Sequence, residues 1–555
     1  MLTKSHCREQ LKEDEHSETE EFFMEKKYAI TYDIGTTGVK TCVFEISDVI
    51  KLLAGASKGY ELYVFPDGGA EQNPDEWWSA MADTTATALE KSGITADKIN
   101  GISFCSQMQG LVLVDKDANY VRRAMSYMDQ RAKAELKKGI AHGPQIAGAN
   151  IPKLLKSLQI TGAVAASVKD PVWKYKWVEA HEPENFKKVH KWLDVKEYLI
   201  ARMTGEFCMT RDSAFATLLY DIRNNKKCWS KEMTDMLGVK YEHMADIKEC
   251  TDKIGVLTEK AAEELHLVPG IAVFGGGGDA SLIGVGAGSV GLGDTHIYSG
   301  TSGWVGTVVD KSIVDASAMI AAIVGADPTK YTYFAELETA GKCLEWAKDH
   351  LCLDEVGIYL KKEDVVNSYE AQYTSLYDYM SEVINSVPAG SNGVIFTPWL
   401  HGNRCPFEDP NARGSFFNLS LETGKSDMLR AVIEGVCMHL RWFIEVQEKK
   451  ISTSKSVRFV GGGALSPVTC QILADVTGKT IETVDNPQNV GAVGAAVIVA
   501  CGLGMINGVK EAKKLIPVVK TYQPQLKNKA VYDKQFEVFK NLYKSNKSNF
   551  AALNG

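Results

Sequence analysis

The sequence predicts an α/β protein built from two related domains that face one another across a cleft. A glycine turn between two β-rich runs occurs twice, at Gly35–Gly38 and again at Gly300–Gly303. Strands that run into glycines alternate with helical stretches along the chain, which is typical of α/β architecture. A length of 555 residues predicts roughly two to four domains. We expect one domain over residues 27–285, a second over 286–555, and the functional site between them.

The composition is that of an ordinary soluble globular protein, with 45% apolar and 24% charged residues. The 62 basic and 70 acidic residues give a net charge of −8, which argues against nucleic acid as a partner. The 12 cysteines show no Cys-x-x-Cys pair and no metal-ligand spacing, so we expect buried, reduced thiols in a cytoplasmic protein. The most apolar stretch, Val490–Met505, is interrupted by four glycines and is too short for a membrane span of roughly 20 residues.

Residues 1–26 are charged in both signs and lack the apolar core of a secretory signal. We expect a mobile N-terminal extension. Met24 lies just before the first strand signal, so a later start of translation and a functional arm both stay open.

The first half opens with a β-hairpin over residues 28–47, because two β-rich runs flank a Gly/Thr turn. A helix is expected over Pro74–Lys91, with Asn73 as its cap and an apolar face that packs into the core. A short strand over Ile99–Phe104 then delivers the polar segment Ser106–Gly110, which is well placed to line a cleft.

Residues 174–205 are expected to be helical, and Gly205 is the expected stop. The strand Ile271–Phe274 runs into four consecutive glycines and Asp279, and a small-residue helix is expected over Ala280–Gly288.

The second half repeats the opening, with strands at Thr295–Ser299 and Trp304–Val309 around the second glycine turn. A helix over Ser426–Glu448, with Ser426 as a candidate cap, precedes a strand at Val457–Val460 that ends in the glycines of residues 461–463. Three further helices are expected, over Pro467–Thr477, Gly491–Cys501 and Tyr532–Tyr543.

Two aspartates are the strongest candidates for chemistry. Asp33 closes a strand before a glycine turn, where its carboxylate and the turn amides suit a phosphate bridged by Mg²⁺, although a turn-forming aspartate has the same pattern. Asp279 follows four glycines, which permit close approach of a ligand to the backbone, and we expect it to act as a general base. A simple helix cap is the alternative for Asp279.

The literal G-x-G-x-x-G at Gly286, Gly288 and Gly291 is not a dinucleotide fingerprint, because its glycines end a helical stretch instead of opening one. The sequence also contains no G-x-x-x-x-G-K-[ST], so it does not predict a Walker-type NTPase.

An ordered set of motifs gives the chain a resemblance to the FGGY carbohydrate kinases, and the match runs from about Tyr28 to the C-terminal helix. The motifs are D-I-G-T-T-G-V-K (33–40), E-Q-N-P-D-E-W-W (71–78), S-Q-M-Q-G (106–110), G-G-G-D-A (276–280), S-G-T-S-G (299–303), D-P-N-A-R-G-S-F-F (409–417), R-A-V-I-E-G (430–435) and G-G-G-A (461–464). Within the family the chain is most similar to the xylulokinase group. The resemblance implies two actin-like, ribonuclease-H-like domains with a catalytic cleft between them, which bind Mg-ATP and close on a sugar or polyol.

The resemblance also implies roles for individual residues. Asp33 would lie near Mg²⁺, Asp279 would be the general base that meets the sugar, and ATP would be the phosphoryl donor. The phosphates and the adenosine of ATP would be bound by Gly35, Thr36, Thr37, Lys40, Gly300, Thr301, Ser302, Gly462, Gly463 and Ala464. Gln107, Met108 and Gln109 would line the sugar pocket.

Two departures from the family pattern bear on the substrate, and a third does not. Gln109 stands where xylulokinases usually have histidine, and Ala280 stands where they usually have asparagine. Asn418 replaces a usual glycine, which we interpret as a local turn variation. The resemblance itself implies phosphorylation of a ketopentose, with D-xylulose first among the candidates. Ribulose, fuculose or erythritol, and an actin-like or Hsp70-like nucleotide switch without a sugar substrate, stay as alternatives. A small-molecule sugar is the expected partner, and a homodimer is left open.

Overall fold

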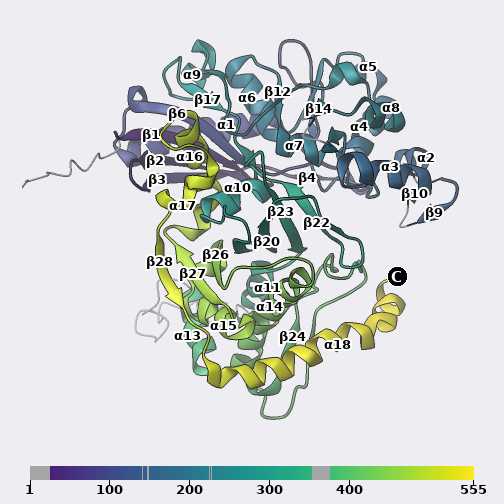
Figure 1. The fold of residues 1–555 in the computed structure, drawn as a ribbon, viewed down its shortest axis with the longest axis vertical. Coiled ribbons are helices and arrows are strands. Elements are labelled where there is room, and N and C mark those ends of the chain that lie inside the picture. The colour runs from purple at the N-terminus through teal and green to yellow at the C-terminus, as the bar shows by residue number, and fades with distance from the viewer. Residues whose placement is uncertain (1–24, 141, 147–148, 224–225, 227, 353–375) are drawn as a thin grey trace, which may run out of the picture.

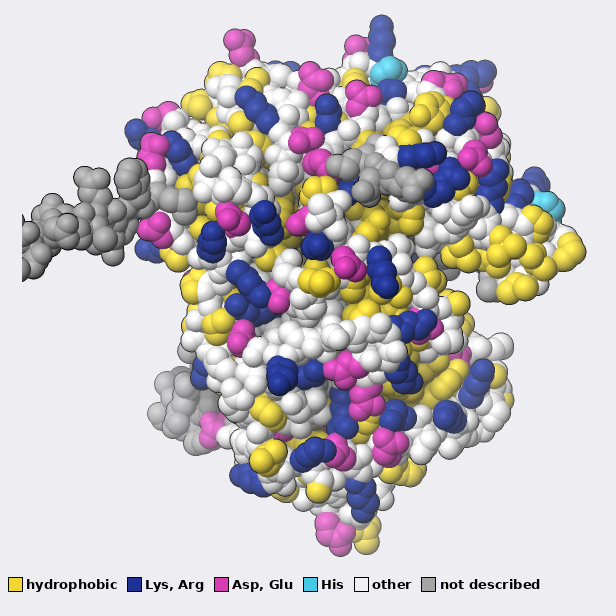
Figure 2. Space-filling view, viewed as in Figure 1, with side chains coloured by type: hydrophobic (Ala, Val, Ile, Leu, Met, Phe, Trp, Pro, Cys, Tyr) yellow, Lys and Arg dark blue, Asp and Glu magenta, His cyan; other side chains and the backbone are white. Residues whose placement is uncertain are grey.

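The computed structural model describes residues 25–140, 142–146, 149–223, 226, 228–352 and 376–555. Most of the expected N-terminal extension therefore lies outside the described residues. Figure 1 shows two lobes stacked along the long axis of the molecule, the first coloured purple to teal and the second mostly green to yellow. On the face shown in Figure 2, basic and acidic side chains are interspersed, and the outline narrows between the lobes.

Each lobe is centred on one mixed sheet. The sheet of the first lobe has the order β16-β17-β6-β1-β2-β3, with β18 paired to β6. Its strands are β1 (Lys27–Ile34), β2 (Gly38–Ile46), β3 (Ile50–Gly59), β6 (Ile99–Ser106), β16 (Lys253–Val256), β17 (Ala272–Phe274) and β18 (Gly277–Gly278). The sheet of the second lobe has the order β21-β22-β23-β20-β19-β26-β27-β28. Its strands are β19 (Thr295–Ser299), β20 (Gly303–Val309), β21 (Val314–Asp315), β22 (Ile320–Val324), β23 (Tyr331–Leu337), β26 (Ser456–Val460), β27 (Thr480–Val484) and β28 (Val518–Tyr522).

The two sheets share one topology. In each sheet an antiparallel trio (β1, β2 and β3; β19, β20 and β23) continues into two parallel strands (β6 and β17; β26 and β27). This repeated order, together with helices on both faces, confirms the predicted duplication of an α/β domain. Both predicted hairpins are present, and each glycine turn joins the first two strands of its sheet.

Helices cover both sheets, and one helix from the second half of the sequence packs on the sheet of the first lobe. Helix α1 (Pro74–Ser92) packs on β2 and β3, while α16 (Val490–Gly502), from the second half of the sequence, packs on β1, β6 and α10 (Asp279–Gly286). Figure 1 shows the yellow α16 against the purple strands of the first lobe. The contact between α10 and α16 is backbone to backbone, because a Cβ atom at Gly286 would lie 1.8 Å from the Val490 carbonyl oxygen.

The remaining helices and small sheets complete the lobes. The other helices are α2 (Lys133–Gly139), α3 (Ile151–Thr161), α4 (Pro171–His181), α5 (Pro183–Phe186), α6 (Val195–Thr204), α7 (Arg211–Ala216), α8 (Lys231–Leu237), α9 (Glu259–Glu264), α11 (Gly341–Ala347), α13 (Leu376–Ser386), α14 (Lys425–Glu448), α15 (Pro467–Thr477), α17 (Ala512–Leu515) and α18 (Lys529–Asn554). The small sheets comprise β4 (Tyr63–Val64), β5 (Ala70–Gln72) and β8 (Ala124–Met125); β7 (Val112–Val114) and β11 (Lys191–Leu193); β9 (Gln145–Ile146) and β10 (Ala149–Asn150); β12 (Cys208–Thr210) and β15 (Asp246–Lys248); β13 (Tyr220–Asp221) and β14 (Cys228–Trp229); and β24 (Ile395–Thr397) and β25 (Ser415–Phe417).

Two local predictions are wrong. The region 174–205 is not helical throughout, because β11 interrupts it and pairs with β7; the helix that follows does end before Gly205, as predicted. Ser426 does not cap α14: the cap is Gly424, whose N–H donates to the Asp427 carboxylate at 2.9 Å. The predicted cap of α1 is confirmed, since the Asn73 side chain accepts from the Asp75 N–H at 3.1 Å. Among the described residues, no helix has the length and apolarity needed to cross a bilayer.

Candidate active site

Asp33 lies near the end of β1, on the sheet face that α16 covers. It is paired with Lys40 on β2 and with Cys105 on β6, and a Cβ atom at Gly491 of α16 would lie 3.1 Å from its Oδ2. Burial raises the pKa of the Asp33 carboxyl, while the charge of Lys40 and a hydrogen bond with Cys105 lower it. The Lys40 ammonium itself donates to the Gln488 carbonyl oxygen at 2.9 Å, so it ties the first lobe to the start of α16.

The first glycine turn is closed by its own backbone. The Gly35 N–H donates to the Gly38 carbonyl oxygen at 2.9 Å, and the Tyr60 hydroxyl donates to the carbonyl oxygens of Gly35 and Gly38 at 2.5 and 3.0 Å. Thr36 is half-buried and Thr37 is exposed. This turn therefore presents backbone amides and threonine hydroxyls at the strand ends, which is the arrangement that binds phosphate in other turns.

The second glycine turn has a matching arrangement. The Gly300 N–H donates to the Ser302 carbonyl oxygen at 3.0 Å, and the Ala340 N–H donates to the Thr301 carbonyl oxygen at 3.0 Å. Gly300 has no room for a side chain, because a Cβ atom there would lie 2.2 Å from the Tyr298 hydroxyl. Burial raises the pKa of Tyr298, and the charges of Asp33 and Asp279 raise it further, so this turn lies within electrostatic reach of both carboxylates.

The third glycine segment, residues 461–464, lies beside the second turn. Gly461 has φ of 90°, and a Cβ atom there would lie 2.5 Å from the Ser299 carbonyl oxygen. Gly463 also lies against the Ser299 side chain, whereas Gly462 has no neighbour within 4 Å of a Cβ position. Ala464 is buried and its N–H donates to the Gly461 carbonyl oxygen at 3.1 Å. The segment can therefore approach a ligand closely with its backbone at Gly462.

Asp279 is the first residue of α10 and is half-buried. Its Oδ1 accepts from the Ala280 N–H at 2.8 Å. Burial raises the pKa of the Asp279 carboxyl to about 7, the Ala280 hydrogen bond opposes this shift, and the charges of Asp33 and Glu336 add to it. A carboxyl with a pKa near neutrality suits a general base. The helix-cap alternative does not describe this residue, because Gly278 occupies the cap position.

The strand register fixes how far apart the two aspartates lie. Asp33 and Gly277 both pair with Cys105, from opposite sides of β6. Because neighbouring strands are about 4.8 Å apart, the Cα atoms of Asp33 and Gly277 are about 10 Å apart. Asp279 follows two residues later, so the two carboxylates belong to one site with space between them.

The segment expected to line a sugar pocket contacts the strand that delivers Asp279. Gly278 packs against Met108, since a Cβ atom there would lie 2.2 Å from the Met108 sulfur. Gln109 has φ of 62°, an uncommon conformation for a residue with a side chain. The Asp194 carboxylate accepts from the N–H groups of Gln109 and Gly110, both at 2.9 Å, which holds this conformation.

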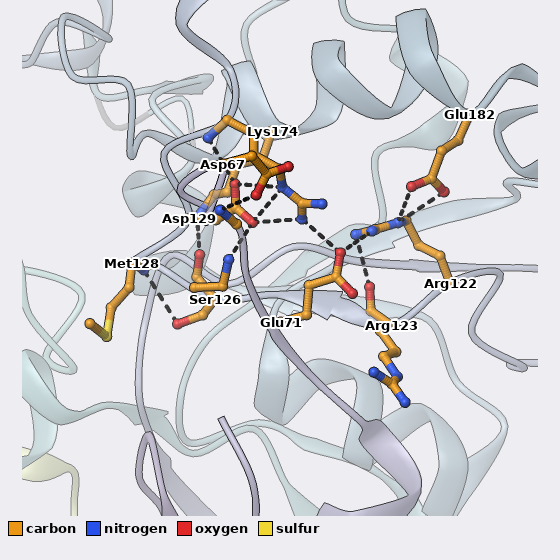
Figure 3. A network of polar contacts seen from close by, with 12 residues as sticks. Asp67, Glu71, Arg122, Arg123, Ser126, Met128, Asp129, Lys174 and Glu182 are labelled. Carbon is orange, nitrogen blue, oxygen red and sulfur yellow. Dashed lines mark hydrogen bonds and ion pairs between the residues drawn. The ribbon is translucent and has the colours of Figure 1, made fainter. Parts of the chain in front are cut away.

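Lys174 also supports the segment Gln107–Gln109. It is fully buried, and its ammonium donates to the carbonyl oxygens of Gln109 and Ser126 at 2.6 and 3.0 Å. Burial lowers the pKa of Lys174 to about 8, against the raising effect of nearby carboxylates. Figure 3 shows Lys174 and Ser126 at the edge of a buried ionic network that also contains Glu71, Arg122 and Asp129.

Sequence reasoning missed Asp212, which supports the segment just before Asp279. Asp212, at the start of α7, accepts from the Gly278 N–H at 2.7 Å and from the Thr210 hydroxyl at 2.6 Å. The charge of buried Lys196 keeps the pKa of Asp212 below its ordinary value despite burial. The neighbouring Arg211 donates to the carbonyl oxygens of Pro328 and Asp327 in the second lobe. The only local sequence signal is the run Thr210–Asp212, and it does not predict the hydrogen bonds of Asp212 and Arg211 to distant segments.

The site fits a magnesium ion that arrives with phosphate. Among the described residues, no group of three or more His, Cys, Asp or Glu side chains could hold a metal by itself. The Asp33 carboxylate is a hard oxygen ligand beside a turn that suits phosphate. Mg²⁺ prefers one or two carboxylates together with water and phosphate oxygens, so one aspartate and a phosphate chain are compatible donors.

Two domains of one topology, each with a glycine turn within electrostatic reach of Asp33 and Asp279, define a nucleotide-dependent phosphotransferase of the actin-like class. The chain belongs to the FGGY family of carbohydrate kinases: the family's N-terminal domain matches residues 28–286 and its C-terminal domain matches residues 296–503. The predicted family, fold class and ATP-dependent kinase activity are thereby confirmed, and the nucleotide switch without a sugar substrate is set aside.

The similar proteins include xylulose kinases and a gluconate kinase. The chain is 28% identical to a xylulose kinase of Bacillus subtilis over 529 residues, which are 95% of this chain and 99% of that relative. The structure of a ligand-bound xylulose kinase from Lactobacillus acidophilus superposes with a TM-score of 0.80 at 26% identity, covering 95% of this chain and all of that one. A gluconate kinase from the same organism gives the same TM-score, identity and coverage.

Proposed function

We propose that the protein transfers the γ-phosphoryl group of ATP to the primary hydroxyl of D-xylulose, which gives D-xylulose 5-phosphate and ADP. The observation that carries the proposal is the Asp279 carboxyl, whose pKa is about 7 and whose strand contacts Met108 of the expected sugar pocket. Similarity to xylulose kinases over nearly the full chain supports this ketopentose.

In the proposed reaction the sugar hydroxyl loses its proton to Asp279 while its oxygen bonds to the γ-phosphorus. The bond from that phosphorus to the β–γ bridging oxygen breaks, and ADP leaves with the bridging oxygen. Asp33 would hold Mg²⁺, which when bound neutralises charge on the phosphates. The turns at Gly35–Thr37 and Gly300–Ser302 would bind phosphate oxygens, with the Gly35 and Gly300 N–H groups closing the turns and the following amides facing the phosphates. Gly462–Ala464 would contact the adenosine.

A second candidate substrate is gluconate, because one of the most similar solved structures is a gluconate kinase. Ribulose, fuculose and erythritol stay as candidates because Gln109 and Ala280 replace residues expected to touch the sugar. Glu336 does not exclude an aldonate by charge repulsion, because its carboxylate, which raises the pKa of Asp279, is itself ion-paired with Arg404 at 2.7 Å.

A substrate screen tests the proposal. ADP release is measured for each sugar at several concentrations, and kcat/KM is the criterion. We expect D-xylulose to have the highest value. A higher value for gluconate or another ketose would replace D-xylulose as the substrate, and ATP turnover that no sugar changes would refute sugar phosphorylation.

The proposal includes the organisation and setting of the enzyme. We propose a sugar-binding domain over 27–285 and a nucleotide-binding domain over 286–555, with residues 1–26 outside both. We further propose a cytoplasmic enzyme whose partner is a small sugar, without nucleic acid or membrane. Size-exclusion chromatography with light scattering tests the open question of a homodimer.

A further inference from the structure

We propose that Gln72 is a positioning residue that aims the backbone amides of the first glycine turn at phosphate and links that turn to the sugar pocket. The inference rests on the proposed function, because it assigns phosphate to the turn at residues 35–38. Gln72 is the last residue of β5 and is 1% exposed. Its role comes from two hydrogen bonds that join segments distant in the sequence.

The Gln72 side chain uses both ends of its amide. Its Nε2 donates to the Thr36 carbonyl oxygen at 2.6 Å, and its Oε1 accepts from the Gln107 Nε2 at 3.1 Å. The Gln107 Nε2 also donates to the Gly35 carbonyl oxygen at 3.1 Å. Two buried side-chain amides therefore hold two consecutive carbonyl groups of the turn.

Holding these carbonyl groups sets the direction of the amides. In a trans peptide the C=O and the N–H point in opposite directions, so a carbonyl fixed toward the protein turns the following N–H away from it. The Gly35 carbonyl binds Tyr60 and Gln107, and the Thr36 carbonyl binds Gln72. Within the described part of the chain, the N–H groups of Thr36 and Thr37 have no protein acceptor. They are the donors left for an anion.

The strand that carries Gln72 is anchored by a buried ionic network. Glu71 accepts from the guanidinium groups of Arg122 and Arg131, and Asp129 accepts from Arg131 and from the Ala70 N–H at 2.9 Å. Figure 3 shows the Glu71 carboxylate meeting Arg122, and Asp129 on the other side of the network. The ionic network fixes β5 and therefore keeps the Gln72 side-chain amide in place. A fixed amide is what a preorganised phosphate-binding turn at residues 35–38 needs.

The hydrogen bond from Gln107 to Gln72 links the glycine turn to the expected sugar pocket. Gln107 is buried, and its Oε1 has no hydrogen-bond partner among the described residues. We assign this oxygen as the acceptor for a sugar hydroxyl. A sugar that binds Gln107 would fix the amide whose other end holds Gly35 and Gln72, so sugar and nucleotide should each tighten the binding of the other by the same factor.

The test measures nucleotide binding instead of turnover. Titration calorimetry gives the Kd of a non-hydrolysable ATP analogue with Mg²⁺, in the absence and presence of saturating D-xylulose. For Gln72→Met, we expect a Kd about tenfold higher with sugar present, equivalent to one hydrogen bond to a charged group. We also expect the ratio of the two Kd values to fall towards one. Gln72→Asn, which is one methylene shorter and cannot span both partners, should act in the same direction and serves if Gln72→Met does not fold.

A matched control separates positioning from stability. Gln535 is also buried and donates to a backbone carbonyl, that of Gly390, at 2.6 Å. Gln535→Met should lower the melting temperature to a similar extent and leave both Kd values unchanged. Wild-type Kd values and an unchanged sugar effect in a folded Gln72 variant would overturn the inference. Asp279→Asn, measured alongside, tests the proposed function separately, because it should bind the analogue normally and fail to turn over.

Discussion

Replacing Asp279 with asparagine should lower turnover by orders of magnitude and, at neutral pH and above, make the protein more stable. The carboxyl has a pKa of about 7 in the folded protein against an ordinary value of 3.8, chiefly because burial disfavours its charged form. Asparagine has nearly the same shape, keeps the acceptor for the Ala280 N–H and carries no charge. The residue proposed as the general base is therefore one that the fold tolerates poorly when it is ionised.

The sign and size of the change in unfolding free energy follow from the linkage between protonation and folding. An acid whose pKa is raised by folding costs nothing below pH 4, where it is protonated in both states. Its cost grows as pH rises and is complete above pH 7, where both states are ionised. A shift of about three units corresponds to about 4 kcal/mol, and water at the half-buried carboxylate should reduce this to about 2 kcal/mol. Turnover should fall by about 10²–10⁴ for loss of a general base.

Urea unfolding of both proteins at pH 4.5 and pH 8 checks the prediction, with kcat measured at pH 8. Asp279→Asn should be the more stable at pH 8, and its advantage over wild type at pH 4.5 should be only about a quarter as large, because a carboxyl of ordinary pKa 3.8 is already largely ionised there in the unfolded state. Asp235→Asn, at an exposed carboxylate of α8, is the control and should change stability by less than about 0.5 kcal/mol. A variant that is less stable than wild type at pH 8 would refute burial as the cause of the raised pKa.

Two further predictions concern the same site, and a third concerns the contact between α10 and α16. The acid limb of kcat/KM should have its midpoint near pH 7, and Glu336→Gln should move it to lower pH because the Glu336 charge raises the pKa of Asp279; an unmoved midpoint contradicts this coupling. Gln109→His should increase kcat/KM for D-xylulose relative to other ketoses and leave the KM for ATP unchanged, whereas an altered KM for ATP alone would exclude a sugar contact. Gly494→Ala should lower the unfolding free energy by about 2 kcal/mol, because the added Cβ atom would lie 2.3 Å from a carbonyl oxygen of α10. Gly424→Ala, with its nearest contact at 3.8 Å, should change stability little in the same urea titration.

The features that the sequence predicts correctly are those with local causes. Both hairpins follow from turn glycines between alternating strands, and α1 follows from the Asn73 cap and the proline after it. The glycine run before Asp279 also identifies a close contact, because each added side chain there would meet a neighbour. In these cases the residues that determine the structure are neighbours in the chain.

The features that the sequence does not predict depend on distant partners. Strand β11 sits within a stretch of good helix formers and forms because β7 offers it a pairing edge. Asp212 and Asp194 support the base and the sugar segment from 66 and 85 residues away, so no local pattern marks them. Gln72 belongs to a recognised motif, yet its partners at Thr36 and Gln107 become apparent only when three segments converge.

The duplicated topology explains how one architecture serves two ligands. Strands β6 and β26 hold the same position in their sheets, each parallel to the first strand of its hairpin. The segment after β6 carries Gln107 to Gln109, with side chains that can donate and accept hydrogen bonds, as a hydroxylated substrate requires. The segment after β26 carries Gly461 to Gly463, where only the backbone is presented, as close packing on a planar base requires. Both glycine turns are proposed to bind phosphate, so under the proposed function the two halves are alike at the turn that takes the same ligand and differ in the segments that take different ligands.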